Sequence, residues 1–406
     1  MKIRSITCFL DPGWPLNEEE IRHAGAFVRA ARPAFEALGF EVQTTRLTTT
    51  PFPDLLDGRD LARAVDLAKT LSSAAMAEGF EYISIGPALP HIPESYEVIP
   101  EILAGTDGVF VSGVMADRDR GISLPAVRRC ARVIHRIAPL EPNGFANLYF
   151  AAMANVPPLT PFYPASYHNG GKPAFALAIE SANLAVDTFD GETSLTAASQ
   201  RLAGAISSRG ETLARLSREL EARFSLAFAG IDFSLAPFPE ELKSIGTAIE
   251  RMGLPAAGGQ GTLAAASLLA SALDRADFPR TGFNGLFFPV LEDSVLAQRS
   301  AEGRLGVNDL LLFSAVCGSG LDIVPLPGET TAEEIEPLLL DLSALALRLN
   351  KPLGARLMPI PGKVAGDPTD FNFPYFANGR VLSLRSEPLR GPFTGEDELK
   401  ISPRGA

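Results

Sequence analysis

Two patterns of apolar and polar positions alternate along the chain. Short segments such as Lys2–Leu10 alternate in character and end at turn residues, which predicts strands. Between them, apolar residues recur every three or four positions, as in Asp60–Glu78, which predicts amphipathic helices. Asn17 and Glu20 have the spacing of a capping box and predict the start of the first helix.

These patterns predict about nine strands interleaved with helices. The strands are expected at Lys2–Leu10, Phe40–Leu47, Phe80–Ile85, Gly108–Met115, Ala146–Asn155, Ala174–Glu180, Gly230–Leu235, Gly285–Leu291 and Gly354–Ile360. Helices are expected at residues 17–38, 60–78, 94–103, 124–137, 193–224, 240–252, 262–273 and 332–349, and from residue 294. Such alternation is typical of a largely parallel sheet with helical crossovers. No Ser-rich, Gly-rich or charged linker divides the chain. We therefore expect one barrel-like α/β domain over residues 1–406, with residues 371–406 as a C-terminal arm, rather than two tandem domains.

Composition and charge narrow the function. Apolar residues make up 46% and charged residues 21%, as in ordinary globular proteins. The net charge of −12 argues against nucleic acid or an anionic membrane as the main partner. Three cysteines favour a reducing compartment without a disulfide framework. No apolar run approaches the roughly 18 residues of a membrane span, and no signal peptide is predicted, so we expect a cytoplasmic protein.

The segment Val316–Asp322 (VCGSGLD) is the most unusual in the chain. It places Cys317 on a glycine-rich turn and Asp322 five residues later. A thiol with a lowered pKa acts as a nucleophile or proton donor, so both residues are candidates for catalysis. A small buried residue at a tight turn explains the same pattern, because free cysteines are usually buried.

Acidic residues on predicted strands mark a second candidate region. Asp232 and Ser234 share one face of a predicted strand, which predicts either a polar cavity or a solvated strand edge. Glu292 and Asp293 follow the carboxyl end of another strand, where α/β sheets bind ligands. Asp293 or Ser294 is expected to cap the next helix, which leaves Glu292 free for chemistry.

Basic and polar residues supply candidate contacts to a substrate. Arg356 lies on an apolar strand with Lys363 just past its end, and a buried cation needs an acidic partner or binds a carboxylate or phosphate. His168 stands in a polar, aromatic loop. Thr262, which either caps a helix or helps to hold an anion, and Asn308 complete this set.

No metal-binding motif is present in the sequence. It contains no HExxH, no CxxC pair and no Cys/His cluster, so a structural zinc is not expected. A divalent cation at Asp232, Glu292 or Asp293 is an option that no spacing requires, and otherwise no cofactor is predicted.

At these segments the chain resembles the prokaryotic family catalogued as domain of unknown function 711. The matching stretches are Ile99–Ser112, Ala154–His168, Gly230–Pro237, Phe283–Arg299, Gly306–Thr330 and Asn350–Lys363. The fold of that family is similar to the barrel of glycyl-radical enzymes such as pyruvate formate-lyase. The resemblance implies a closed, ten-stranded barrel of two parallel halves, surrounded by helices, with the loop that carries Cys317 inserted inside.

The chain departs from the glycyl-radical motif Arg-Val-x-Gly. Arg380 and Val381 are followed by Leu382 and Ser383, so no glycine is in place to hold a radical. The resemblance therefore marks Cys317 as a site residue without a radical role.

These inferences lead to an expected function. We expect non-radical acid–base or nucleophilic chemistry, of lyase or hydrolase type, on a small anionic metabolite inside the barrel. The candidate catalytic residues are Cys317, Asp322, Glu292 and Asp232, and the candidate substrate-binding residues are Arg356, Lys363, His168, Ser234, Asp293, Thr262 and Asn308. Two alternatives are a non-catalytic metabolite-binding or regulatory protein and a scaffold that binds other proteins. A homo-oligomer is compatible with each of them.

Overall fold

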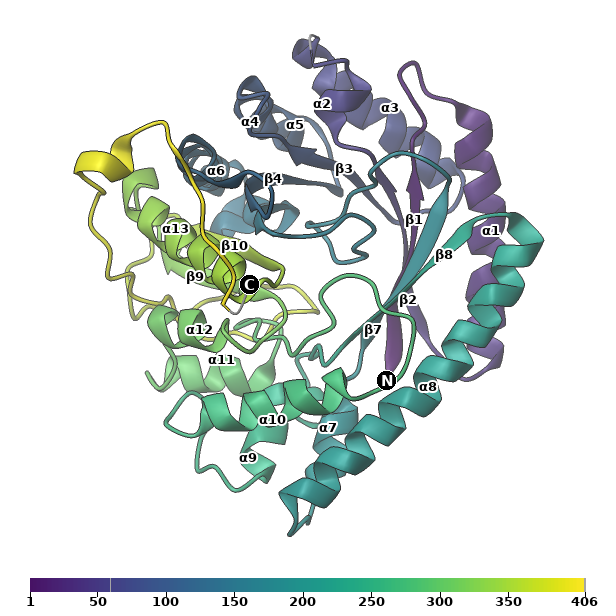
Figure 1. Ribbon diagram of the computed structural model, residues 1–406. Helices are drawn as coiled ribbons and strands as arrows, with labels where there is room; N and C mark the ends of the chain where they lie inside the picture. The colour runs from purple at the N-terminus through teal and green to yellow at the C-terminus, as the bar shows by residue number, and fades with distance from the viewer. Residues whose placement is uncertain (59, 405–406) are drawn as a thin grey trace.

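The computed structural model describes residues 1–58 and 60–404 as a mixed α/β fold around one eleven-stranded sheet (Figure 1). Five strands form its first parallel group, in spatial order β1, β2, β3, β4 and β6. Their bounds are β1 Lys2–Leu10, β2 Val42–Thr49, β3 Tyr82–Ala88, β4 Val109–Asp117 and β6 Phe150–Ala154. Each is buried over most of its length, which is why the sequence shows apolar runs as well as alternation.

Four long strands run in the opposite direction. β7 (Ala174–Glu180) pairs in parallel with β8 (Ala227–Ser234), and β9 (Gly320–Pro327) pairs in parallel with β10 (Leu353–Ile360). The two groups meet at the antiparallel pairs β1–β7 and β6–β10. The sheet path therefore ends at β8 on one side and β9 on the other. Two short strands, β5 (Gly121–Ser123) and β11 (Glu398–Leu399), extend from β4.

A segment between β8 and β9 contacts both of these end strands. Residues 279–291 form parallel bridges to β8 at Ile231–Arg280 and to the residue after it at Leu235–Leu286. On the other side, the Val290 amide donates to the Asp322 carbonyl at 3.2 Å. The predicted strand Gly285–Leu291 is therefore only partly correct, because it forms isolated bridges instead of a continuous ladder. The mixed α/β class is confirmed, while closure of ten strands into a barrel is not shown by the strand pairing.

One predicted strand boundary was wrong, and one strand was not predicted. Residues 142–149 form a 3-10 segment with left-handed backbone at Asn143 and Gly144, so the strand predicted from Ala146 begins only at Phe150. β9 is not among the predicted strands, because its glycine and prolines are unusual in strands.

Thirteen α-helices of the described chain surround the sheet on its outer side (Figure 1). They are α1 Glu18–Ala37, α2 Phe52–Leu55, α3 Ala64–Ala77, α4 Glu94–Glu97, α5 Ile99–Gly105, α6 Leu124–Ile137, α7 Ala182–Phe189, α8 Leu195–Phe224, α9 Ile245–Arg251, α10 Thr262–Asp274, α11 Ser294–Ala301, α12 Val307–Phe313 and α13 Ala332–Leu349. Asn17 caps α1 as predicted, and the buried residues of that helix recur every three or four positions.

The loop of residues 155–173 lies against the opposite face of the strands. Tyr163 donates to the Leu47 carbonyl of β2, and Ser84 of β3 donates to the Ser166 carbonyl. Thr281, in the segment that follows α10, donates to the Leu159 carbonyl. The loop also supplies members of an apolar cluster of Met153, Val156, Phe162, Ala165, Ala236, Phe283 and Phe287. The inner side of the sheet is thus filled by this loop and not by helices.

Candidate functional site

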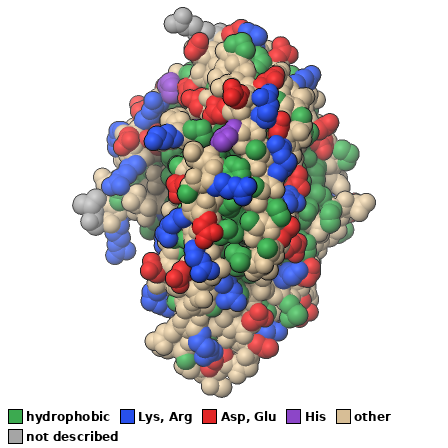
Figure 2. Space-filling model, turned by 90° about the vertical axis from the view of Figure 1, so that its right-hand side faces the viewer, with side chains coloured by type: hydrophobic (Ala, Val, Ile, Leu, Met, Phe, Trp, Pro, Cys, Tyr) green, Lys and Arg blue, Asp and Glu red, His purple; other side chains and the backbone are tan. Residues whose placement is uncertain are grey.

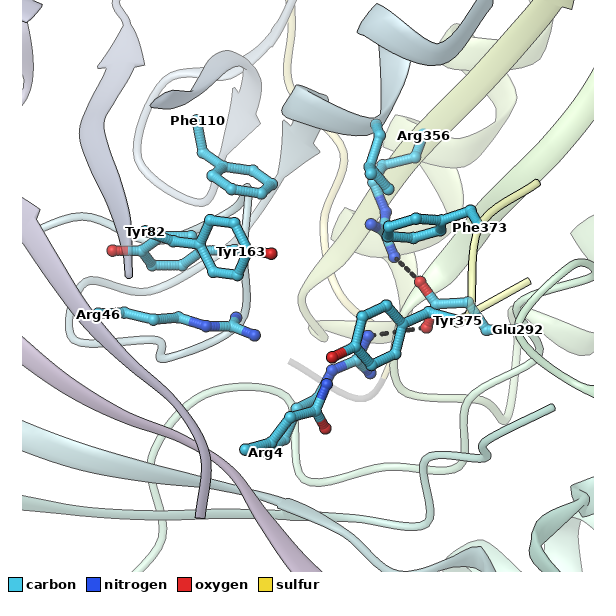
Figure 3. Close-up of a pocket in the computed structure, with 11 residues that line it drawn as sticks. Arg4, Arg46, Tyr82, Phe110, Tyr163, Glu292, Arg356, Phe373 and Tyr375 are labelled. Carbon is cyan, nitrogen blue, oxygen red and sulfur yellow. Dashed lines mark hydrogen bonds and ion pairs between the residues drawn. The ribbon is translucent and has the colours of Figure 1, made fainter. Parts of the chain in front are cut away.

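A small cavity with three arginines lies where the first strands of the sheet begin (Figure 3). Its volume is about 70 Å³, room for a few water molecules or one small anionic group. The lining residues are Arg4, Gln43, Arg46, Tyr82, Phe110, Leu148, Tyr163, Glu292, Arg356, Phe373 and Tyr375. The aromatic rings and the guanidinium groups come from both parallel groups of strands, from the loop of residues 155–173 and from the C-terminal segment that begins at residue 371.

One wall of the cavity is a chain of alternating charges (Figure 3). Glu292 accepts hydrogen bonds from Arg4 at 2.7 Å and from Arg356 at 3.3 Å. Behind it, Arg356 Nε donates to Asp322 Oδ1 at 2.5 Å. Arg356, Glu292 and Asp322 are each at most 5% exposed, so this ion-pair chain is shielded from water.

Two irregularities in the sheet place these groups. The β1–β7 register shifts between Ile3 and Ser5, so Arg4 can reach the cavity although Ile6 and Cys8 of the same strand lie in the apolar core. The β9–β10 register shifts opposite Arg356, at Asp322.

The shift in β9 includes an unusual backbone conformation. The residue after Asp322, Ile323, is fully buried and has a φ of 50°, a left-handed conformation that β-branched residues rarely adopt. Such strain persists only where the surrounding structure imposes it, and it is concentrated at functional sites.

Arg46 stands on the opposite wall without an acidic partner. Its Nε donates to Thr44 at 2.9 Å, and its guanidinium lies 4.9 Å from the ring centre of Tyr163 and 5.9 Å from that of Tyr82. Within the described residues it forms no ion pair, although it is only 8% exposed. Burial, together with the positive charge of Arg4, lowers the pKa of Arg46 to about 10, so it remains charged at neutral pH.

Two further polar atoms at the cavity lack partners in the described part of the chain. Arg4 Nη1 and Gln43 Oε1 are both buried and make no hydrogen bond there. One is a charged donor and the other an acceptor. Because buried polar atoms are normally hydrogen-bonded, their position in the wall is suited to a ligand that carries both an acceptor and a donor.

The charges of the cavity shift one another's pKa values. Burial alone would raise the pKa of Glu292, but Arg4 and Arg356 outweigh it and hold that pKa below its usual value. Burial raises the pKa of Asp322 despite the neighbouring Arg356. Glu292 is therefore an ionised ligand of two arginines, and Asp322 is the carboxyl group more easily protonated.

The C-terminal segment forms the rim of the cavity. Phe373 and Tyr375 line it, and the Ala377 amide fixes the segment by donating to the Leu291 carbonyl at 2.6 Å. From this rim the chain continues to β11.

Cys317 lies at a different place. Its thiol is buried near the Gly320 carbonyl, in a second cavity of about 390 Å³ that shares no residue with the arginine cavity. Burial raises the pKa of Cys317, which opposes formation of the reactive thiolate. Lys351 donates to the Ser314 carbonyl at 3.1 Å and also to the Cys317 carbonyl, so it fixes the backbone of this loop. The structure does not bring the thiol together with Asp322 and Glu292.

Asp232 and Ser234 also lie outside the arginine cavity. Asp232 accepts hydrogen bonds from the Phe283 amide at 2.8 Å, the Asn284 amide at 3.1 Å and the Ser234 hydroxyl. These bonds fix residues 283–284 against β8, which is a structural role.

Asp293 caps two helices. Its carboxylate accepts from the Val295 and Leu296 amides at the start of α11, each at 3.0 Å. It also accepts from the Ser244 hydroxyl and the Ile245 amide at the start of α9, each at 2.6 Å. The expected helix cap is confirmed, and Glu292 is the neighbour that faces the cavity.

This double cap gives a first prediction. Replacing Asp293 by Ala should lower the free energy of unfolding by about 2 kcal/mol, because the buried amides lose their acceptor. Asp293→Asn, which keeps one acceptor oxygen, should lose less. Urea denaturation of both variants measures the difference, and an Ala variant as stable as the parent protein would contradict the capping role.

The remaining candidates are placed elsewhere. Lys363 pairs with Asp370 at 3.0 Å in the C-terminal segment. Thr262 accepts from the Gly258 amide at 3.0 Å at the start of α10, and Asn308 is exposed on α12. His168 is buried beside Phe9, where burial lowers its pKa. None of these side chains lines the arginine cavity.

The carboxylates considered for a divalent cation do not converge. Glu292 is bound by arginines, whereas Asp232 and Asp293 are bound by hydroxyl and amide groups. Among residues 1–58 and 60–404, no group of three or more His, Cys, Asp or Glu side chains has a metal-binding arrangement. In the same residues, no helix combines the length and apolar character needed to cross a membrane.

Comparison with known proteins identifies the family. The family model described as "Uncharacterised ACR (DUF711)" matches residues 1–374. A UPF0210 protein of Pyrobaculum arsenaticum is 33% identical over 378 residues, covering 87% of this chain and 82% of the relative. UPF0210 proteins of Acetivibrio thermocellus and Methanosarcina mazei are 31% and 30% identical, covering 86% and 85% of this chain and 81% and 80% of the relatives. The chain therefore belongs to the DUF711 family, as its sequence motifs suggested.

Proposed function

We propose that the arginine cavity binds a small anionic metabolite and that the protein performs polar acid–base chemistry on it. The observation that carries this proposal is Arg46, a buried guanidinium that faces the cavity without a carboxylate of its own. Leaving a buried charge uncompensated is costly, so such a group is retained where a ligand supplies the opposite charge. Arg4 Nη1, also without a partner in the described chain, adds a second donor.

The proposed chemistry uses Asp322 as the proton carrier. Its raised pKa makes a protonated carboxyl group accessible, and Oδ2 has no hydrogen-bond partner in the described residues. Asp322 does not itself line the cavity but lies directly behind Arg356, so its free oxygen would have to meet the ligand past that side chain and not through it. Glu292 would orient the arginines. Because Cys317 lies in a separate cavity, we favour proton transfer of the lyase or hydrolase type over nucleophilic attack by its thiol.

The proposal includes closure of the sheet. Residues 279–291 bond to β8 and β9, and counting them as a tenth strand gives two oppositely directed parallel groups of five. We propose that this segment closes a barrel of the glycyl-radical type. The missing glycine after Val381 favours chemistry without a radical.

A second candidate is ligand binding without turnover. It is favoured by Glu292, which is held by two arginines with a lowered pKa and is therefore a poor proton acceptor. Incubation of any ligand with the protein, followed by mass analysis, separates the two candidates, because only an enzyme converts it.

Replacing Arg46 by Gln tests the binding site itself. The dissociation constant for the anion should rise about 10- to 100-fold, since charge-assisted hydrogen bonds are lost. The ligand-free protein should be no less stable, because Arg46 has no acidic partner within the described residues and lies near Arg4. Calorimetric titration and thermal unfolding with a panel of small carboxylates, phosphate and sulfate measure both effects.

The matched control is Arg136→Gln, which removes an exposed arginine paired with Glu97 and Glu101. It changes the net charge equally and should leave anion affinity unchanged. Equal loss in both variants, or anion binding that is insensitive to Arg46, would reject the cavity as the binding site.

A further inference from the structure

The arginine cavity has a definite charge. In the resting site, with Asp322 ionised beside Arg356, the three arginines Arg4, Arg46 and Arg356 contribute three positive charges. Glu292 and the adjoining Asp322 contribute two negative ones. Lys2 pairs with Glu180 at 3.7 Å. Burial raises the pKa of Glu180 to about 7, so Glu180 is mostly ionised at pH 7.5 and this pair adds no net charge. The described groups around the cavity therefore carry a net charge of one positive unit, and this unit is located at Arg46.

The charge count restricts the ligand. A monoanion would neutralise the site, whereas a dianion such as phosphate or sulfate would leave an excess negative charge beside Glu292. Buried charges are stable only when they are compensated, so the site should discriminate between the two. The cavity volume of about 70 Å³ also favours a compact group.

Gln43 restricts the ligand further. Its Oε1 atom is buried and has no partner in the described chain, and it lines the same cavity as Arg4 Nη1. An acceptor beside two guanidinium groups is complementary to a hydroxyl or amino group next to a carboxylate. A plain carboxylate would leave the Gln43 oxygen without a hydrogen bond.

We infer that the ligand is a small monocarboxylate bearing a neighbouring hydrogen-bond donor, and that the charge balance of the cavity excludes dianions. This inference rests on the proposed anion-binding function and names its ligand class. Glu292 sets the charge preference, and Gln43 recognises the donor.

Calorimetric titration of the full chain with three probes tests the inference: glycolate, acetate and sulfate, at pH 7.5 and constant ionic strength set with chloride. Glycolate should bind tightest, acetate several-fold more weakly, and sulfate at least about tenfold more weakly than glycolate. Gln43→Leu should remove the advantage of glycolate over acetate without abolishing acetate binding.

Charge variants provide the decisive comparison. Glu292→Gln raises the net charge by one unit and should reverse the order, so that sulfate binds more tightly than acetate. Gln43→Glu, close in shape to the native side chain, lowers the charge by one unit and should abolish binding of all three probes even if Glu292→Gln does not fold.

The outcomes separate this inference from the proposed function. Sulfate that binds the parent protein as tightly as glycolate, with loss in Arg46→Gln, would overturn the ligand class and leave the anion site intact. Equal glycolate and acetate affinities would overturn the role of Gln43. Absence of any binding that depends on Arg46 would overturn both the inference and the proposed function.

Discussion

Replacing Arg356 by Met is expected to lower the free energy of unfolding by about 3–5 kcal/mol, the cost of removing one partner from a buried ion pair. Arg356 is 4% exposed and is the only residue of the described chain that bonds both Glu292 and Asp322. Methionine replaces much of the arginine stem but carries no charge. The loss therefore comes mainly from Asp322, which is left buried without a cation and must be either uncompensated or protonated, whereas Glu292 keeps its hydrogen bond from Arg4. Urea denaturation of both proteins measures it.

The effect should depend on pH in a defined direction. Without Arg356, the folded-state pKa of Asp322, already raised by burial, should rise further above its unfolded value. A carboxyl group of this kind penalises the folded state at high pH, and the penalty disappears as pH falls through the folded pKa. The difference in the free energy of unfolding between the variant and the parent protein should therefore be smaller at pH 5 than at pH 8. Arg136→Met, at an exposed position, should change stability by less than about 1 kcal/mol. Similar stability of the Arg356 variant and the parent protein would show that these carboxylates are solvated.

The site could be predicted from the sequence where an ionisable residue interrupts an apolar element. Arg356 is predicted in this way, whereas Glu292 is predicted from its place after a strand and Asp322 from its spacing to Cys317. The structure joins the three in one ion-pair chain. Arg4 and Arg46 carry the same signal, since both lie on strands that are otherwise largely buried, but their importance depends on which strands face each other.

The direction of a loop could not be predicted from local pattern. The glycines around Cys317 indicate a tight turn correctly, yet only the packing of α10 and residues 283–285 decides that the thiol lies away from the arginines. For the same reason, the register shifts at Arg4 and Asp322 leave no trace in the periodicity, because a bulge is defined by the partner strand.

The contact between Gly285 and Gly318 links the two unusual segments of the sequence. The Gly318 amide donates to the Leu286 carbonyl at 2.6 Å, so the loop before β9 and the segment after β8 pass each other without side chains between them. A Cβ atom built on Gly285 would lie 2.2 Å from the Cα atom and 2.7 Å from the amide nitrogen of Gly318. Both obstructing atoms belong to the backbone and cannot rotate away, so the glycines are required by space and not by backbone angle.

Gly285→Ala should therefore lower the free energy of unfolding by about 3 kcal/mol or more, at the upper end of what overpacking costs. Because residues 279–291 also carry the chain to Glu292, separation of the two segments should weaken anion binding at the cavity as well. Gly204→Ala is the matched control, since that glycine is exposed on α8 with nothing within 4 Å of an added Cβ. It should be neutral or stabilise the protein by up to about 1 kcal/mol. Thermal and urea unfolding, with anion titration of each variant, measure both effects, and a Gly285 variant that matches the control would show that the two segments do not touch in solution.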